Sequence, residues 1–157
     1  HMSGSLAPDV NANAKGVWFG FSLNHTKAHF ARAIMESLAF ILRRNLSALK
    51  DMGITVKEVR SLGGGSKSKV WNQIKADAND ITLVTVKSKE AACLGAAILA
   101  GTATGVFKSV EDAVANMIQV KDEYHAQPEL KPVYDKNYEM YCKLFKDLTE
   151  CFDENAK

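Results

Sequence analysis

The sequence is poor in the features that mark specialised protein classes. It has three cysteines, none in a C-x-x-C pair, and three prolines among 157 residues, so neither a disulfide scaffold nor a cysteine-based zinc module is indicated. Its longest apolar run, at 91–100, is too short and too alanine-rich to span a bilayer. Its 20 basic and 18 acidic residues nearly cancel, which gives no electrostatic reason to bind nucleic acid or membranes. We therefore expect a cytoplasmic protein with neither of these partners.

What remains is an ordinary globular composition, with 46% hydrophobic and 24% charged residues, in a chain long enough for one core. Hydrophobic periodicity predicts alternating strands and helices, followed by further helices. The predicted strands are 17–21, 56–62 and 81–86. The predicted helices are 27–52, 67–79, 90–100, 109–117 and 134–152, with Pro128 and Pro132 in a loop before the last. This alternation indicates an α/β fold with a small sheet flanked by helices.

The first 15 residues differ from the rest because they are small, polar and rich in turn formers. His1-Met2 is typical of an expression tag. We therefore predict that residues 1–15 are a tag remnant and flexible lead-in, and that residues 16–157 form the folded domain.

A run of glycines at the end of a predicted strand is the most informative local feature. The strand 56–62 leads directly into Gly63-Gly64-Gly65-Ser66, and a helix follows. Glycine lets a ligand approach the main chain closely, and a helix N-terminus presents unpaired N–H groups that favour phosphate. Lys67 and Lys69 oppose the helix dipole at a cost of about 0.3–1 kcal/mol each, which a bound anion would offset. The alternative is a tight structural turn beside solvated lysines.

The glycine run fits neither standard phosphate-binding motif. The dinucleotide fingerprint would place Ser68 at its third glycine position, and Lys87 and Ser88 stand where an acidic residue is expected. A P-loop needs a longer loop that closes with Gly-Lys-Ser/Thr. A nicotinamide-cofactor domain, with Lys87 facing a ribose phosphate, stays open as one alternative.

Two histidines, His25 and His29, are four residues apart and could share one helix face. This spacing can bind a metal, but no third ligand is evident nearby. We therefore predict capping and packing roles for both, and no metal site.

Three motifs follow one another along the chain. The first comprises Gly16–Gly20, His29-Phe30 and Ala33–Glu36, with Phe21 where a smaller aliphatic residue is usual. The second comprises Leu62–Ser66, Ser68, Trp71, Gln73, Ala76 and Asp77, and the third Glu90–Ala92 and Leu94–Ala97. Together they resemble the signatures of the FGGY carbohydrate kinases over about residues 7–150, and the sequence most resembles the xylulose kinases within that family.

The resemblance implies an actin-like, hexokinase-like (ribonuclease H-like) ATPase fold with ATP held between two lobes. Residues 16–157 would then be a C-terminal domain fragment without its N-terminal lobe. The catalytic base, most sugar contacts and the Mg²⁺ ligands would lie outside this chain. The resemblance thus implies part of an ATP-dependent kinase of a pentulose such as D-xylulose, with no catalytic residue and no activity alone.

The resemblance also implies the residues that bind the adenine nucleotide, namely Gly63, Gly64, Gly65, Ser66 and Lys69. The main chain of Gly64 and Gly65 would face the phosphates and ribose. Ser66 and Lys69 would border the adenine pocket. Outside this set, the resemblance and helix context together favour structural roles for Trp71, Asp77 and Glu36.

Two further expectations concern partners. A non-catalytic α/β binding or dimerisation module would explain the lack of a catalytic acid without truncation. The aromatic residues of 17–21 are too apolar for a free strand edge, so we expect an exposed apolar patch there and a possible homodimer.

Overall fold

The sheet has three strands in the order β1-β2-β3. The computed structural model describes residues 1–88 and 90–157. The strands are β1 (Glu58–Ser61), β2 (Thr82–Val86) and β3 (Val120–Tyr124). The helices are α1 (Lys27–Asp51), η1 (Gly64–Lys67), α2 (Lys69–Asn79), α3 (Ala91–Ala103), α4 (Val110–Met117), η2 (Pro128–Leu130), α5 (Lys131–Asp147) and α6 (Thr149–Glu154). The α/β alternation predicted after residue 56 is therefore present.

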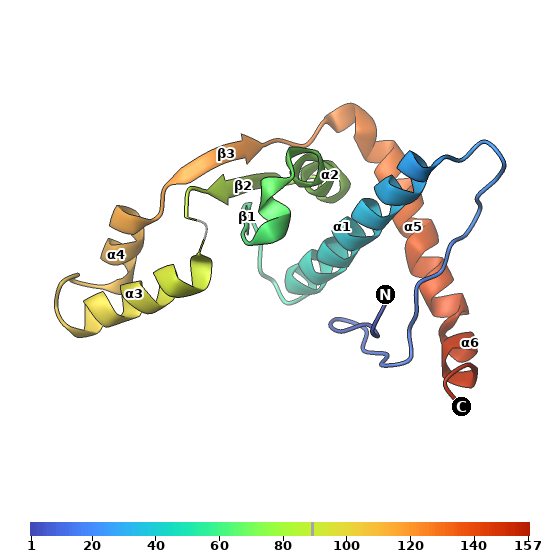
Figure 1. The fold of residues 1–157 in the computed structure, drawn as a ribbon, viewed down its shortest axis with the longest axis horizontal. Helices are drawn as coiled ribbons and strands as arrows, with labels where there is room; N and C mark the ends of the chain where they lie inside the picture. Colours follow the sequence, from blue (N-terminus) through green and yellow to red (C-terminus); the bar gives the residue numbers. More distant parts are fainter. Residues whose placement is uncertain (89) are drawn as a thin grey trace.

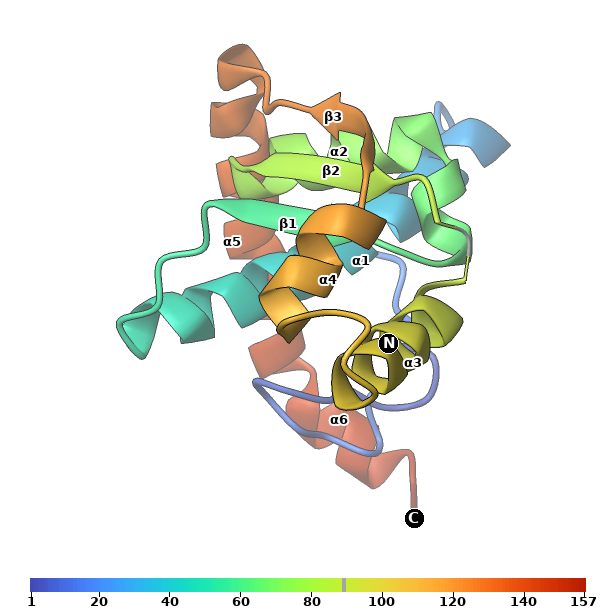
Figure 2. The same ribbon diagram turned by 90° about the vertical axis from the view of Figure 1, so that its left-hand side faces the viewer.

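The first two strands are parallel, and α2 makes the crossover that parallel pairing requires. The third strand pairs antiparallel with β2. Figure 1 shows α3 and α4 at one end of the molecule and α1, α5 and α6 at the other, with the sheet between them. Figure 2 shows the three strands side by side, with α2 behind β2.

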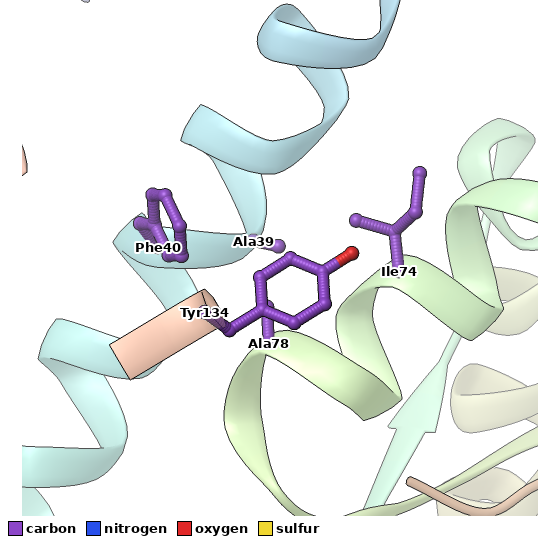
Figure 3. Packing of buried hydrophobic residues seen from close by; sticks show 5 residues of the cluster. All are labelled: Ala39, Phe40, Ile74, Ala78 and Tyr134. Carbon is purple, nitrogen blue, oxygen red and sulfur yellow. The ribbon is translucent and has the colours of Figure 1, made fainter. Parts of the chain in front are cut away.

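The main core lies where α1, α2 and α5 meet. Its buried residues come from these three helices: Ala39, Phe40, Ile74, Ala78 and Tyr134 (Figure 3). The ring of Phe40 lies 5.7 Å from that of Tyr138 and 5.5 Å from that of Tyr141. The predicted aromatic face of the last helix is therefore a packed face, as expected from its 3–4 spacing.

The predicted strand at 17–21 is wrong. These residues have no regular secondary structure, although their side chains are exposed as expected, with 65% of Phe19 accessible. Trp18 and Phe21 instead lie beside Phe30 of α1, with ring centroids 4.7 and 5.9 Å away. Aromatic residues favour strands through packing on neighbouring strands, and no described strand lies next to this segment.

The loop predicted around Pro128 and Pro132 is also wrong, because these residues lie in η2 and α5. Pro132 lies in the first turn of α5, where its missing N–H costs no hydrogen bond. The helix then breaks at Leu148 before α6. β3 was not predicted, because three of its five residues are charged, which suits an edge strand better than a core strand.

The start of α1 is capped as predicted. Thr26 and His29 form a reciprocal capping box, and the backbone N–H of Thr26 donates to Nδ1 of His29 at 3.1 Å. Nδ1 of His25 accepts from the backbone N–H of Ser22 at 2.8 Å. Gly53 follows the helix with a left-handed φ of 81°, as expected for a glycine at the helix end. In the described part of the chain, no helix is both long and apolar enough to cross a membrane.

Candidate functional site

The glycine run forms a tight turn between β1 and α2. Gly63 has φ 76° and ψ −163°, a conformation that L side chains rarely adopt. The short helix η1 follows, and Ser68 then caps α2 by accepting from the N–H of Trp71 at 3.2 Å. The predicted strand, glycine turn and helix are all present, with a 3₁₀ turn inserted before α2.

The three glycines have different surroundings. A Cβ atom built at Gly63 or Gly64 would have no neighbour within 4 Å, whereas one at Gly65 would lie 2.8 Å from Cζ3 of Trp71. Gly63 and Gly64 therefore leave room for a ligand close to the main chain. Gly65 instead lets the turn pack directly on an aromatic ring.

Donor groups of the turn are available to a ligand. The N–H of Ser66 donates to the carbonyl of Gly63 at 3.2 Å, but among the described residues the N–H groups of Gly64 and Gly65 meet no backbone acceptor. These are the groups that the start of a helix leaves unpaired. The hydroxyl of Ser66 donates to the carbonyl of Gly63 at 2.7 Å, so its hydrogen is used within the turn.

The two lysines beside the turn are exposed. Lys67 ends η1 and Lys69 begins α2, and neither forms an ion pair within residues 1–88 and 90–157. The main-chain donors and these two ammonium groups give the turn a locally positive character. An anionic ligand is the chemical complement of this surface.

A polar network that the sequence analysis missed lies beneath the turn. Asn72 is fully buried, and its Nδ2 donates to the carbonyl of Ser66 at 2.7 Å. Its Oδ1 accepts from the hydroxyl of Ser61 at 3.2 Å, and Nζ of Lys75 donates to the same hydroxyl oxygen at 3.3 Å. Burial lowers the pKa of the Lys75 ammonium. One sequence feature could have revealed the burial of Asn72. It precedes Ala76 by one helical turn, on a face that must meet the sheet.

Two open cavities in the described part of the chain do not include the glycine turn. The first, of about 230 Å³, lies between the C-terminal half of α1, the loop at 54–56 and the end of α2, and the second, polar and of about 360 Å³, lies near His125. Neither includes Ser66 or Lys69, so the predicted adenine pocket stays a prediction. Among the described residues, no group of three or more His, Cys, Asp or Glu side chains is placed to hold a metal.

Residues 1–104 match the C-terminal domain of the FGGY family of carbohydrate kinases. The chain belongs to the FGGY family. The family match removes the basis for a nicotinamide-cofactor domain.

Relatives within the FGGY family act on different sugars. A xylulose kinase of Staphylococcus epidermidis is 32% identical over 146 residues, which are 93% of this chain and 29% of that protein. An L-fuculokinase of Escherichia coli O157:H7 is 41% identical over 101 residues, 64% of this chain and 21% of that protein. The chain thus spans less than a third of the length of these curated relatives.

The fold agrees with the same family. The solved structure of ligand-bound xylulose kinase from Lactobacillus acidophilus superposes with a TM-score of 0.86 and 27% identity, covering 98% of this chain and 31% of that chain. The fold class expected from the resemblance, an actin-like ATPase fold of the sugar kinases, is therefore confirmed.

Three residues of the FGGY motifs make contacts within the chain that agree with the structural roles predicted for them. Trp71 packs against the core, and its indole N–H donates to the carbonyl of Met35 at 3.1 Å. Asp77 is buried and accepts from the backbone N–H of Gln127 at 2.9 Å, which ties α2 to the segment before α5. Glu36 pairs with Arg32 at 2.8 Å on one face of α1.

Proposed function

We propose that this chain is the nucleotide-binding portion of an ATP-dependent sugar kinase. The observation that carries the proposal is the turn at Gly63–Ser66 in a member of the FGGY family. It combines open Cβ positions, adjacent lysines and two N–H groups that meet no backbone acceptor among the described residues. These features fit a polyphosphate that approaches the main chain. A cytoplasmic location is retained as part of the proposal.

Different residues of the turn would contact different parts of the nucleotide. The N–H groups of Gly64 and Gly65 would donate to phosphate oxygens, and Lys69 with Ser66 would border the adenine. ATP would supply the phosphoryl group that is transferred to a sugar hydroxyl. The ligands of Mg²⁺ are expected outside this chain, in whose described residues no group of three or more His, Cys, Asp or Glu is placed to hold a metal.

The sugar is proposed to be a pentulose such as D-xylulose. Support comes from the xylulose kinase of Staphylococcus epidermidis, which aligns over 93% of this chain. The sugar would bind only in a full-length enzyme, because this chain spans 29% of that relative. Phosphoryl transfer to an alcohol needs a positioned general base, which we expect outside this chain.

A coupled assay for ADP release tests whether this chain lacks the catalytic base. With D-xylulose and ATP, this chain alone should show no sugar-dependent turnover, because the base is expected elsewhere. Turnover that depends on the sugar and is lost on mutation of a residue of this chain would contradict the proposal. Calorimetric titration provides a second test of the proposal. ATP should bind weakly, and NADP should bind no more tightly than the adenosine phosphate part of that molecule alone.

A further inference from the structure

We propose that Asn72 is a positioning residue that holds the glycine turn in the shape required for nucleotide binding, an inference that rests on the proposed function above. Asn72 has no accessible surface and cannot touch a ligand itself. Its amide instead joins two elements, the end of β1 through Ser61 and the turn through the carbonyl of Ser66. It therefore acts on the nucleotide through the main chain of Gly63–Ser66.

Lys75 fixes which groups of this network donate and which accept hydrogen bonds. Lys75 has only N–H donors, so the hydroxyl oxygen of Ser61 accepts from it at 3.3 Å and the hydroxyl hydrogen is left to donate to Asn72. Asn72 must therefore present its oxygen to Ser61 and its NH₂ group to Ser66. An aspartate lacks the NH₂ donor and a leucine lacks both the donor and the acceptor, so an asparagine is specifically suited to this position.

The other side of the turn is held by Trp71. A Cβ at Gly65 would touch its ring at 2.8 Å, and the ammonium of Lys75 lies 4.4 Å from the ring centroid. Asn72 and Trp71 are neighbours in α2 and together fix the turn at Ser66 and Gly65. A turn fixed in advance loses less conformational freedom when a ligand binds, so the N–H groups of Gly64 and Gly65 are ready to donate.

The test compares two asparagine variants of the same helix. Asn72→Leu removes both contacts beneath the turn, whereas the control Asn79→Leu removes amide contacts to Ala39 and Lys75 at the opposite end of α2. The first readout is amide hydrogen exchange of Ser66 and Ser68 without nucleotide, corrected for global stability by urea denaturation. The second is the dissociation constant of ATP by calorimetry.

We expect Asn72→Leu to accelerate exchange of the turn amides and to weaken ATP binding about three- to tenfold, while Asn79→Leu does neither at matched stability. If Asn72→Leu fails to fold, the milder variant Ser61→Ala replaces it. Ser61→Ala should change the amide exchange and the ATP affinity in the same direction. Unchanged exchange at Ser66 and Ser68, or equal effects of the two asparagine variants, would overturn the inference. Failure of the unmodified chain to bind ATP would contradict the proposed function instead, since the exchange readout still reports whether Asn72 sets the turn.

Discussion

Gly64 and Gly65 are adjacent in the turn, yet only one of them has a packing reason to be glycine. A Cβ at Gly65 would overlap the ring of Trp71, while one at Gly64 would face open space. Gly65→Ala should therefore lower the free energy of unfolding by about 1–3 kcal/mol through overpacking. Gly64→Ala is the matched control and should change it by less than about 0.5 kcal/mol. Urea denaturation of both variants provides the measurement, and equal effects would show that Trp71 does not restrict the turn.

The charge of Asp135 gives a pH-dependent prediction. Hydrogen bonds from Arg43 of α1, and then from Lys131, hold the pKa of Asp135 below its usual value. A carboxyl with a lowered folded-state pKa stabilises the protein above its unfolded pKa of about 4, and this contribution is lost as pH falls through the folded value. Because the pair is partly exposed, Asp135→Asn should cost about 1 kcal/mol or less at pH 7.

The same difference should shrink toward zero as the solution is acidified below pH ~4. Denaturation of wild type and Asp135→Asn at several pH values checks this, with Glu150→Gln as a control for removing an acidic residue that forms no ion pair within the described residues. A difference that is independent of pH would mean that the carboxylate charge makes no contribution.

Local residue patterns indicate the glycine turn, but not the side chains that hold it in place. The glycines and the flanking lysines are local signals, so the turn at Gly63–Ser66 and its role as a candidate phosphate site could be predicted. Asn72 gave no such signal, because its importance depends on a strand residue eleven positions earlier and a lysine on the next helical turn. Contacts of this kind follow from the packing of α2 on β1.

At the scale of elements, helices were predicted better than strands. The caps and periodic apolar faces of α1, α2 and α4 depend on residues that are close together in the sequence. The segment 17–21 has strand-forming residues but no described strand beside it, whereas β3 has charged residues and forms by pairing with β2. Strand formation depends on such neighbours, which are distant in sequence and which composition alone does not reveal.

For the whole molecule, the exposed apolar residues of 17–23 predict self-association. Phe19 and Phe21 are about two-thirds accessible and Leu23 is fully accessible, and an apolar patch of this kind favours a partner surface. Sedimentation equilibrium should show mass rising with protein concentration. A double variant with Phe19→Asp and Phe21→Asp should reduce this association at least severalfold, and Val106→Asp at another exposed site should not. A chain that stays monomeric at millimolar concentration would contradict the expected homodimer.

The proposed function depends on binding of the phosphates of an adenine nucleotide at the turn Gly63–Ser66. Titration of ¹⁵N-labelled protein with ATP, followed by two-dimensional NMR, tests it most directly, because each glycine of the turn gives its own amide signal. We expect the largest shifts at Gly63–Lys69, and their loss in Gly64→Val, whose side chain would occupy the space left for the ligand. Shifts centred on α5, or shifts that persist in Gly64→Val, would contradict it.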